Sequence, residues 1–265
     1  MQKEELDQAN IASHNDWDNG ALATAISTMR SSAYDGEGYT ICMWNPNPTI
    51  AQQAIHLLMW LGAPKGFRVF LFWRDDPRIL TATGILTPKN VNGGFAVPNT
   101  PQLFVYRSEE WDRVLLHECI HALGWDWPSF PVQPCWKLSS NSTLLPHLFE
   151  AWTELFAEWL WCLWWAPEDD TTGRTWNLQR EWQEVQALQV LARSSDRWTE
   201  TTNAFAYYVL KTALAPRIDF LLIMGSEIVP TEVCERAGVE LDRLRASPVR
   251  PKRMRLRMTN PKIHA

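Results

Sequence analysis

The chain has 265 residues, of which 46% are hydrophobic and 21% are charged, so it can bury a sizeable core and is not globally disordered. Its formal net charge of −5 argues against a protein that binds nucleic acid over its whole surface. The polar N-terminal stretch lacks the apolar core of a signal peptide, and no apolar run is long enough for a transmembrane helix. We therefore expect an intracellular protein, cytoplasmic or nuclear, without a membrane partner.

The first half of the chain alternates between helical and extended patterns. Apolar periodicity and turn residues predict helices at 17–30 and 50–62. Runs rich in branched and aromatic residues predict strands at 39–44, 67–73 and 102–107. Before the last of these strands, residues 81–98 predict a hairpin-like excursion that turns at NGG, residues 92–94.

A further helix is expected directly after the strand that ends near residue 107. Ser108 is a good N-cap residue, and Glu109 and Glu110 suit the positive end of the helix dipole. Gly124 is a natural residue to end the helix. The stretch LLHECIHALGW, residues 115–125, lies within this helix, and its apolar flanks indicate that the helix is buried.

The second half of the chain is mainly helical, with helical patterns near 144–165, 176–193, 198–214 and 231–246. The first half mixes strands and helices and the second half is helical, and this order predicts an α+β fold. We expect one domain over residues 1–247 and a basic tail over 248–265, which contains a compact cluster of basic residues: Arg250, Lys252, Arg253, Arg255 and Arg257. The tail is either a solvated extension or strand, or a contact for nucleic acid, which is otherwise not an expected partner.

Cysteine and tryptophan usage adds two expectations. The five cysteines include no CxxC pair, which favours free and mostly buried thiols in a reducing compartment; they are Cys42, Cys119, Cys135, Cys162 and Cys234. The 16 tryptophans predict an aromatic-rich core, with a substrate groove partly lined by tryptophan as the alternative.

His117 and His121 lie four residues apart on the expected helix, so their imidazoles project from one face. This spacing lets both histidines bind one tetrahedral zinc ion. Glu118 is rotated by about 100° around the helix from His117, so it can act on a water molecule beside the metal. The alternative is an ordinary helix with two satisfied histidines, but burying these groups without a partner would be costly.

The HECIH motif resembles that of the HExxH zinc metallopeptidases. The metzincin pattern needs a histidine where this chain has Trp127, so that branch is excluded. Further along, EAWTE resembles a segment of the thermolysin-like gluzincins, in which the first glutamate binds zinc and the acidic residue one turn later supports a ligand histidine. Carried over, the resemblance implies Glu150 as the third ligand and Glu154 as its neighbour in a supporting role.

A second register remains open on the same helix, because ELFAE fits a looser gluzincin pattern with Glu154 as the ligand and Glu158 as its support. Glu150, Glu154 and Glu158 are spaced by four residues and form one carboxylate stripe. The helix carries so many large apolar residues that we expect the stripe to face the interior, where a metal ion is the simplest partner.

The resemblance implies a zincin-like α+β fold and a zinc-dependent metallopeptidase that acts on peptides or proteins, with Glu118 as general base. Tyr207 and Tyr208 are candidates to stabilise the oxyanion, although core packing is the alternative use of both tyrosines. A substrate is expected to add as a strand at the strand 102–107 or at the excursion before it. The alternative function is a non-catalytic protein of zincin fold with a structural or interaction role.

Overall fold

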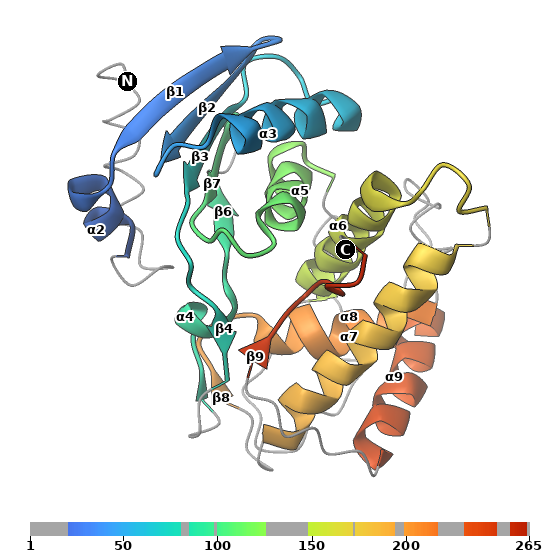
Figure 1. The fold of residues 1–265 in the computed structure, drawn as a ribbon. Helices are drawn as coiled ribbons and strands as arrows, with labels where there is room; N and C mark the ends of the chain where they lie inside the picture. The colour runs from blue at the N-terminus through green and yellow to red at the C-terminus, as the bar shows by residue number, and fades with distance from the viewer. Residues whose placement is uncertain are drawn as a thin grey trace. The chain divides into compact units, whose positions relative to one another are not determined.

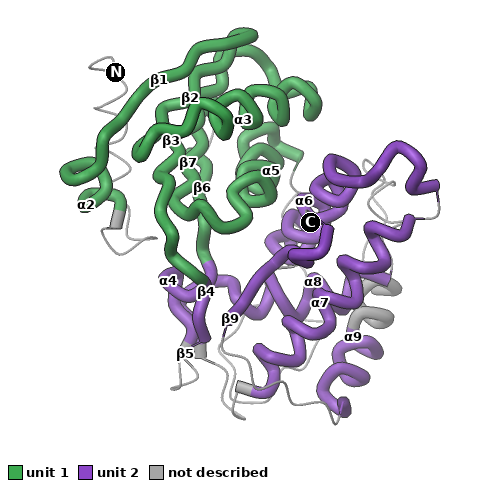
Figure 2. Tube along the Cα trace, viewed as in Figure 1, with its two compact units in different colours: residues 1–77, 92–125 green, residues 78–91, 126–265 purple. Residues whose placement is uncertain are grey.

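The computed structural model describes residues 21–80, 85–97, 100–125, 148–171, 173–193, 199–216, 231–247 and 255–263. The chain divides into two compact units, which are described one at a time (Figure 2). Unit 1 comprises residues 1–77 and 92–125, and unit 2 comprises residues 78–91 and 126–265. In the described parts of the chain, no helix combines the length and the apolar character needed to cross a membrane.

Unit 1 is built on a mixed five-stranded sheet with the strand order β1-β2-β3-β7-β6 (Figure 1). The strands are β1 (Ser31–Gly36), β2 (Tyr39–Trp44), β3 (Arg68–Phe72), β6 (Gly94–Ala96) and β7 (Gln102–Val105). The inner strands β2, β3 and β7 run parallel to one another. The two edge strands, β1 and β6, run antiparallel to their neighbours.

Helices cover both faces of this sheet. Helix α2 (Ala21–Thr28) packs on the face that carries stacked aromatic rings, among them Phe70 and Phe104 with centroids 4.6 Å apart. Alternate residues of the same strands point to the opposite face, where α3 (Pro48–Leu61) and α5 (Trp111–Ala122) lie (Figure 1). The inner strands are therefore apolar on both faces, as expected of a covered parallel sheet.

Unit 2 is mainly helical. Its helices are α4 (Pro88–Val91), α6 (Leu148–Trp165), α7 (Arg174–Arg193), the π-helix η2 (Phe205–Leu210), α8 (Lys211–Leu214) and α9 (Thr231–Ala246). The described residues of unit 2 also form two small strand pairs: β4 (Arg78–Ile79) with β9 (Arg255–Leu256), and β5 (Ile85–Leu86) with β8 (Thr199–Glu200). The predicted α+β class, with a mixed sheet followed by a mainly helical half, is confirmed.

The excursion before β7 differs from its prediction. Strand β5 pairs with β8, helix α4 follows, and the NGG sequence leads into β6, whose partner is β7. In the described part of this range, residues 85–97, the chain therefore does not form a hairpin that turns at residues 92–94. The glycines suggested a turn, but Gly94 begins a strand at a place where the backbone approaches helix α5 closely.

The segment predicted as a basic tail contributes to the packing of unit 2. In its described part, residues 255–263, Leu256 and Thr259 are completely buried and Arg255 is exposed. Arg257 N donates to Gln186 Oε1 at 2.9 Å, and Trp182 Nε1 donates to the carbonyl of Arg257 at 3.2 Å. These contacts match the strand alternative for this segment, with apolar residues turned inward and Arg255 turned outward.

Three cysteines fall where the structure describes their side chains, and all three are free and buried: Cys42, Cys119 and Cys162. The prediction of buried free thiols is confirmed for these residues. Cys135 and the side chain of Cys234 lie outside the described part of the chain. Buried Trp44 and Trp161 belong to the largest side chains of the core, so part of the tryptophan content serves packing as predicted.

Candidate metal site on helix α5

Helix α5 begins at Trp111, so the prediction of Ser108 as its N-cap is wrong. Glu110 precedes the helix with a left-handed φ of 61° and makes no side-chain capping bond. The Ser108 hydroxyl instead donates to the carbonyl of Arg74 at 2.8 Å, which ties the approach of the helix to the loop after β3. The other end is as predicted, because Gly124 adopts a φ of 64° and its N–H donates to the carbonyl of His121 at 3.1 Å.

The two histidines of HECIH turn the same ring atom toward one point. Nε2 of His117 and Nε2 of His121 are 2.9 Å apart, and the ring planes meet at 73°. His117 is buried and His121 is half-buried. Glu118, which lies between them in the sequence, is also buried. One ligand atom from each of the three residues lies within 4.8 Å of the others. The predicted grouping of these three side chains on one helix is therefore present.

The edge strand β6 passes directly against Glu118. A Cβ atom built on Gly94 would lie 3.1 Å from Cγ of Glu118, 2.7 Å from Cγ1 of Val114 and 2.5 Å from the carbonyl oxygen of Phe104. Real Cβ atoms do not come within 3.0 Å of other atoms, so this contact requires glycine. The absence of a side chain at Gly94 is what lets the start of β6 approach the acidic residue of the motif.

Cys119 sits next to Glu118 in the sequence and is fully buried. Burial raises the pKa of the Cys119 thiol far above its ordinary value of 9.0, and the negative charge of Glu118 raises it further. The thiol therefore stays protonated at neutral pH. Because a thiolate is the form that acts as a nucleophile or binds metal, we do not expect Cys119 to do either at neutral pH.

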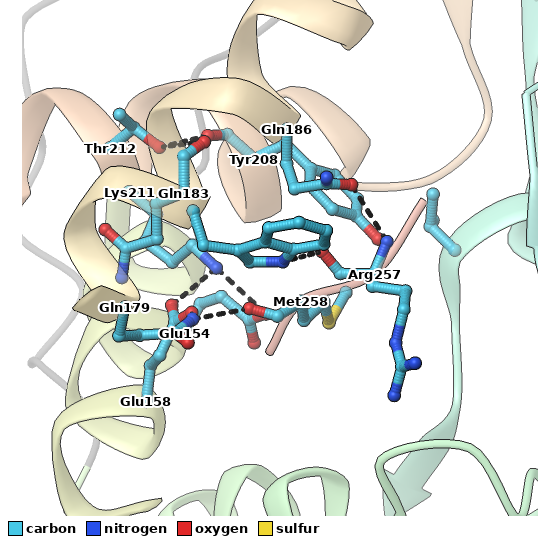
Figure 3. A network of polar contacts seen from close by, with 12 residues as sticks. Glu154, Glu158, Gln179, Gln183, Gln186, Tyr208, Lys211, Thr212, Arg257 and Met258 are labelled. Carbon is cyan, nitrogen blue, oxygen red and sulfur yellow. Dashed lines mark hydrogen bonds and ion pairs between the residues drawn. The ribbon is translucent and has the colours of Figure 1, made fainter. Parts of the chain in front are cut away.

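The carboxylate stripe of α6 is buried in unit 2, as predicted: Glu150, Glu154 and Glu158 have exposures of 8%, 1% and 0%. A lysine that the sequence reading did not consider lies against two of them (Figure 3). Nζ of Lys211 is 2.6 Å from Oε2 of Glu158 and 4.0 Å from Oε1 of Glu154. The burial of Glu158 thus has a cationic partner from the protein itself.

Gln179 of α7 links this ion pair to the C-terminal segment (Figure 3). Its Nε2 donates to Oε1 of Glu158 and, at 2.7 Å, to the carbonyl of Met258. Its Oε1 accepts the backbone N–H of Asn260 at 2.8 Å. One buried amide therefore joins α6, α7 and residues 258–260, and it contacts Oε1 of Glu158 while Lys211 contacts Oε2.

Tyr207 and Tyr208, the candidates for oxyanion stabilisation, lie in the π-helix η2 and are buried. Nζ of Lys211 is 5.9 Å from the centre of the Tyr208 ring, and the carbonyl of Tyr208 accepts the Thr212 hydroxyl at 2.7 Å. π-Helical turns are rare and often occur at functional sites. Both tyrosines belong to unit 2, and their role toward a substrate stays a prediction.

The donor set on α5 fits a divalent metal of the zinc type. Two imidazole Nε2 atoms converge, and a carboxylate lies within 4.8 Å of both, which is the ligand chemistry that zinc prefers. A catalytic zinc needs three protein ligands, and Glu118 is expected to serve as base. The third ligand, Glu150 or Glu154, belongs to unit 2 and stays a prediction.

Sequence reasoning missed two residues that shape these clusters. Lys211 stands alone as a charged residue in the apolar run AYYVLKTALA, and a lone lysine in such a run signals a buried cation that needs a carboxylate. Gly94 stands at the start of a strand, where a glycine marks a close approach of another segment. Both signals are present in the sequence, although neither names its partner.

Comparison with known proteins finds no match for this chain, either among protein-family models, among curated proteins or among solved structures. The HExxH resemblance therefore rests on the motif residues themselves. Its support in the molecule is the geometry of His117, Glu118 and His121 on one buried helix beside an antiparallel edge strand.

Proposed function

We propose that this chain is a zinc-dependent metallopeptidase whose centre is helix α5. The observation that carries the proposal is the convergence of His117, Glu118 and His121, with the two Nε2 atoms 2.9 Å apart and all three ligand atoms within 4.8 Å. An i, i+4 histidine pair with an intervening glutamate is the arrangement that lets one helix bind zinc and supply a base.

In this proposal His117 and His121 hold the metal through Nε2, and Glu150 of α6 is the third ligand. Glu154 is the alternative third ligand. When bound, zinc lowers the pKa of water and polarises the carbonyl of the peptide bond. The carboxylate of Glu118 takes a proton from the attacking water and passes it to the leaving nitrogen. Glu118 follows His117 directly and is therefore rotated about 100° from it around the helix, which in the HExxH arrangement suits a base rather than a further ligand.

The layout of unit 1 supports a zincin-like reading of the fold. The sheet is mixed, its edge strand β6 is antiparallel to β7, and both strands pack on the helix that carries the motif. An extended peptide can add to an exposed strand edge through main-chain hydrogen bonds. We propose that the substrate pairs with β6, because Gly94 of that strand lies against Glu118.

The direct test is peptide hydrolysis by the purified, zinc-loaded full chain, measured by mass spectrometry on a mixed peptide pool. We expect cleavage that a chelator abolishes and added zinc restores. Glu118→Gln should retain zinc while the rate falls by about 10²- to 10⁴-fold, which is the usual contribution of a general base. His56→Ala, which removes an exposed histidine of α3 that bonds Gln52, is the matched control and should retain both zinc and activity.

Two other outcomes would change the proposal. If the wild-type chain binds zinc but cleaves no peptide of the pool, a non-catalytic role for a zincin-like fold becomes the better account. If Glu118→Gln cleaves as fast as the wild type, Glu118 is not the base and the assignment of roles on α5 is wrong.

A further inference from the structure

Arg107, two residues after β7, is a buried arginine that joins two separate loops of unit 1. Its exposure is 5%. Nε donates to the carbonyl oxygen of Asn92 at 2.6 Å, and Nη1 donates to the carbonyl oxygen of Asp76 at 2.6 Å. The chain leaves unit 1 after residue 77 and re-enters it at residue 92, so one guanidinium ties the two ends of this excursion together.

The tie lies at the start of the edge strand that contacts Glu118. The N–H of Tyr106, next to Arg107, donates to the carbonyl of Gly93 at 2.9 Å, and Gly94 then pairs with Val105 of β7. Three consecutive residues are thus held in place: residue 92 by Arg107, residue 93 by Tyr106, and residue 94 by its pairing with β7. The position of Gly94 against Glu118 depends on this anchored start, since β6 is only three residues long.

We propose that Arg107 is a positioning residue for peptide hydrolysis: by anchoring residue 92 to residue 76, it sets where a substrate strand paired with β6 lies relative to Glu118. This inference rests on the proposed function. The two hydrogen bonds of Arg107 given above go to backbone carbonyls, one of them at the start of β6, so the proposed role acts through the position of β6.

The chemistry of the residue fits this role. A guanidinium carries several donors in a rigid plane, so it can bond two carbonyls from different loops at once. A lysine ammonium is a point donor on a flexible chain and does not reproduce that fixed geometry. Burying a cation is costly unless its donors are satisfied, so an arginine here indicates that the position of the two carbonyls matters.

The experiment compares Arg107→Lys and Arg107→Met with the wild type and with Arg78→Lys. Arg78 is the matched control, because it is also fully buried and its Nε also donates to a backbone carbonyl, that of Val91 at 2.8 Å, but within unit 2. Each full-length protein is assayed well below its melting temperature for zinc content, for KM and kcat, and for hydrogen exchange in residues 92–97 and at the Tyr106 amide.

We expect both Arg107 variants to retain zinc, to exchange faster in residues 92–97, and to show a KM raised by about 10-fold, with a smaller loss for lysine than for methionine. Arg78→Lys should lower the melting temperature without changing KM. The inference is overturned if the Arg107 variants show wild-type exchange in β6, if Arg78→Lys raises KM equally, or if neither Arg107 variant folds, since Arg107 is then a purely structural residue.

Failure of the proposed function gives a different pattern. A wild-type chain without zinc and without hydrolysis removes the metallopeptidase reading whatever the variants do. A zinc-binding wild type that hydrolyses peptides, with Arg107 variants of unchanged KM and unchanged exchange, removes the positioning role alone.

Discussion

Two buried clusters of this molecule use the same spacing on a helix and reach different chemistry. On α5, residues four apart turn two imidazole Nε2 atoms to within 2.9 Å of each other beside a carboxylate. On α6, Glu154 and Glu158 are also four apart, but the ammonium of Lys211 lies 2.6 Å from Glu158. The first cluster gathers two imidazole nitrogens beside a carboxylate, and the second gathers an ion pair.

The difference shows that i, i+4 spacing settles which side chains share a face and not what they meet there. A glutamate stripe on an apolar helix needs a cation, and in unit 2 a lysine supplies one for Glu158 from the helix that follows η2. Substituting Lys211, the cationic partner of Glu158, and Gly94, which packs against Glu118, tests this contrast.

The largest effect is expected from Lys211→Met, which keeps the length of the side chain and removes the cation. Glu158 is completely buried, so its carboxylate would lose its partner ion, which costs about 3–5 kcal/mol in comparable cases. The free energy of unfolding, measured with urea, should fall by this amount. Adding Glu158→Gln to the Lys211→Met variant should recover part of the loss, because the two residues are coupled.

A surface ion pair serves as the control for Lys211→Met. Arg243 lies 2.9 Å from Glu184 and 2.6 Å from Glu240, but its side chain is 49% exposed. Arg243→Met should therefore cost less than about 1 kcal/mol. Equal losses for Lys211→Met and Arg243→Met would contradict the view that Lys211 balances a buried charge.

A smaller loss of stability is expected from Gly94→Ala, on the side of α5. The added methyl group would meet the carbonyl of Phe104 at 2.5 Å and Val114 at 2.7 Å, so β6 or α5 must shift. Overpacking of this kind costs about 1–3 kcal/mol. We also expect slower peptide hydrolysis with unchanged zinc content, and a matched substitution at Gly173, where nothing lies within 4 Å of the built Cβ, should leave hydrolysis unchanged.

The smallest effect concerns the two thiols that flank the clusters. Burial first, and then Glu118 or Glu158 respectively, raises the pKa of Cys119 and Cys162 in the folded chain, while Lys211 lowers that of Cys162. When the pKa of a thiol is higher in the folded chain, its contribution to the free energy of unfolding is constant below the unfolded pKa of about 9. This contribution falls as the pH rises above that value. Urea unfolding between pH 7 and pH 10.5 should show this fall, and Cys119→Ala should reduce its slope.

Much of the fold was predictable because local patterns decide it. Strands β2, β3 and β7 are continuous apolar runs between turn residues, and the helix patterns match α3, α6, α7 and α9. Strand β1 was not predicted, because its residues are half-buried or exposed and its apolar content is low. The short strands β4 and β5 were not predicted either, since their partners, β9 and β8, lie far along the chain.

The candidate site was predictable only where its residues belong to one helix. The spacing of HECIH fixes that His117, Glu118 and His121 share one stretch of helix, and the geometry agrees. The role of Lys211 could not be predicted, because its contact with Glu158 spans residues 158–211 and depends on how α6 packs against α8. The need for glycine at position 94 depends likewise on the approach of β6 to α5.

The central claim is that helix α5 binds zinc, and elemental analysis of the purified full chain tests it most directly. We predict about one zinc per chain in the wild type, loss of zinc in His117→Ala and His121→Ala, and retention in His56→Ala. Loss in Glu150→Ala but not in Glu154→Ala would identify the third ligand as proposed. A wild type that stays free of zinc after incubation with the metal, or a His121→Ala variant that binds it as the wild type does, would contradict the account.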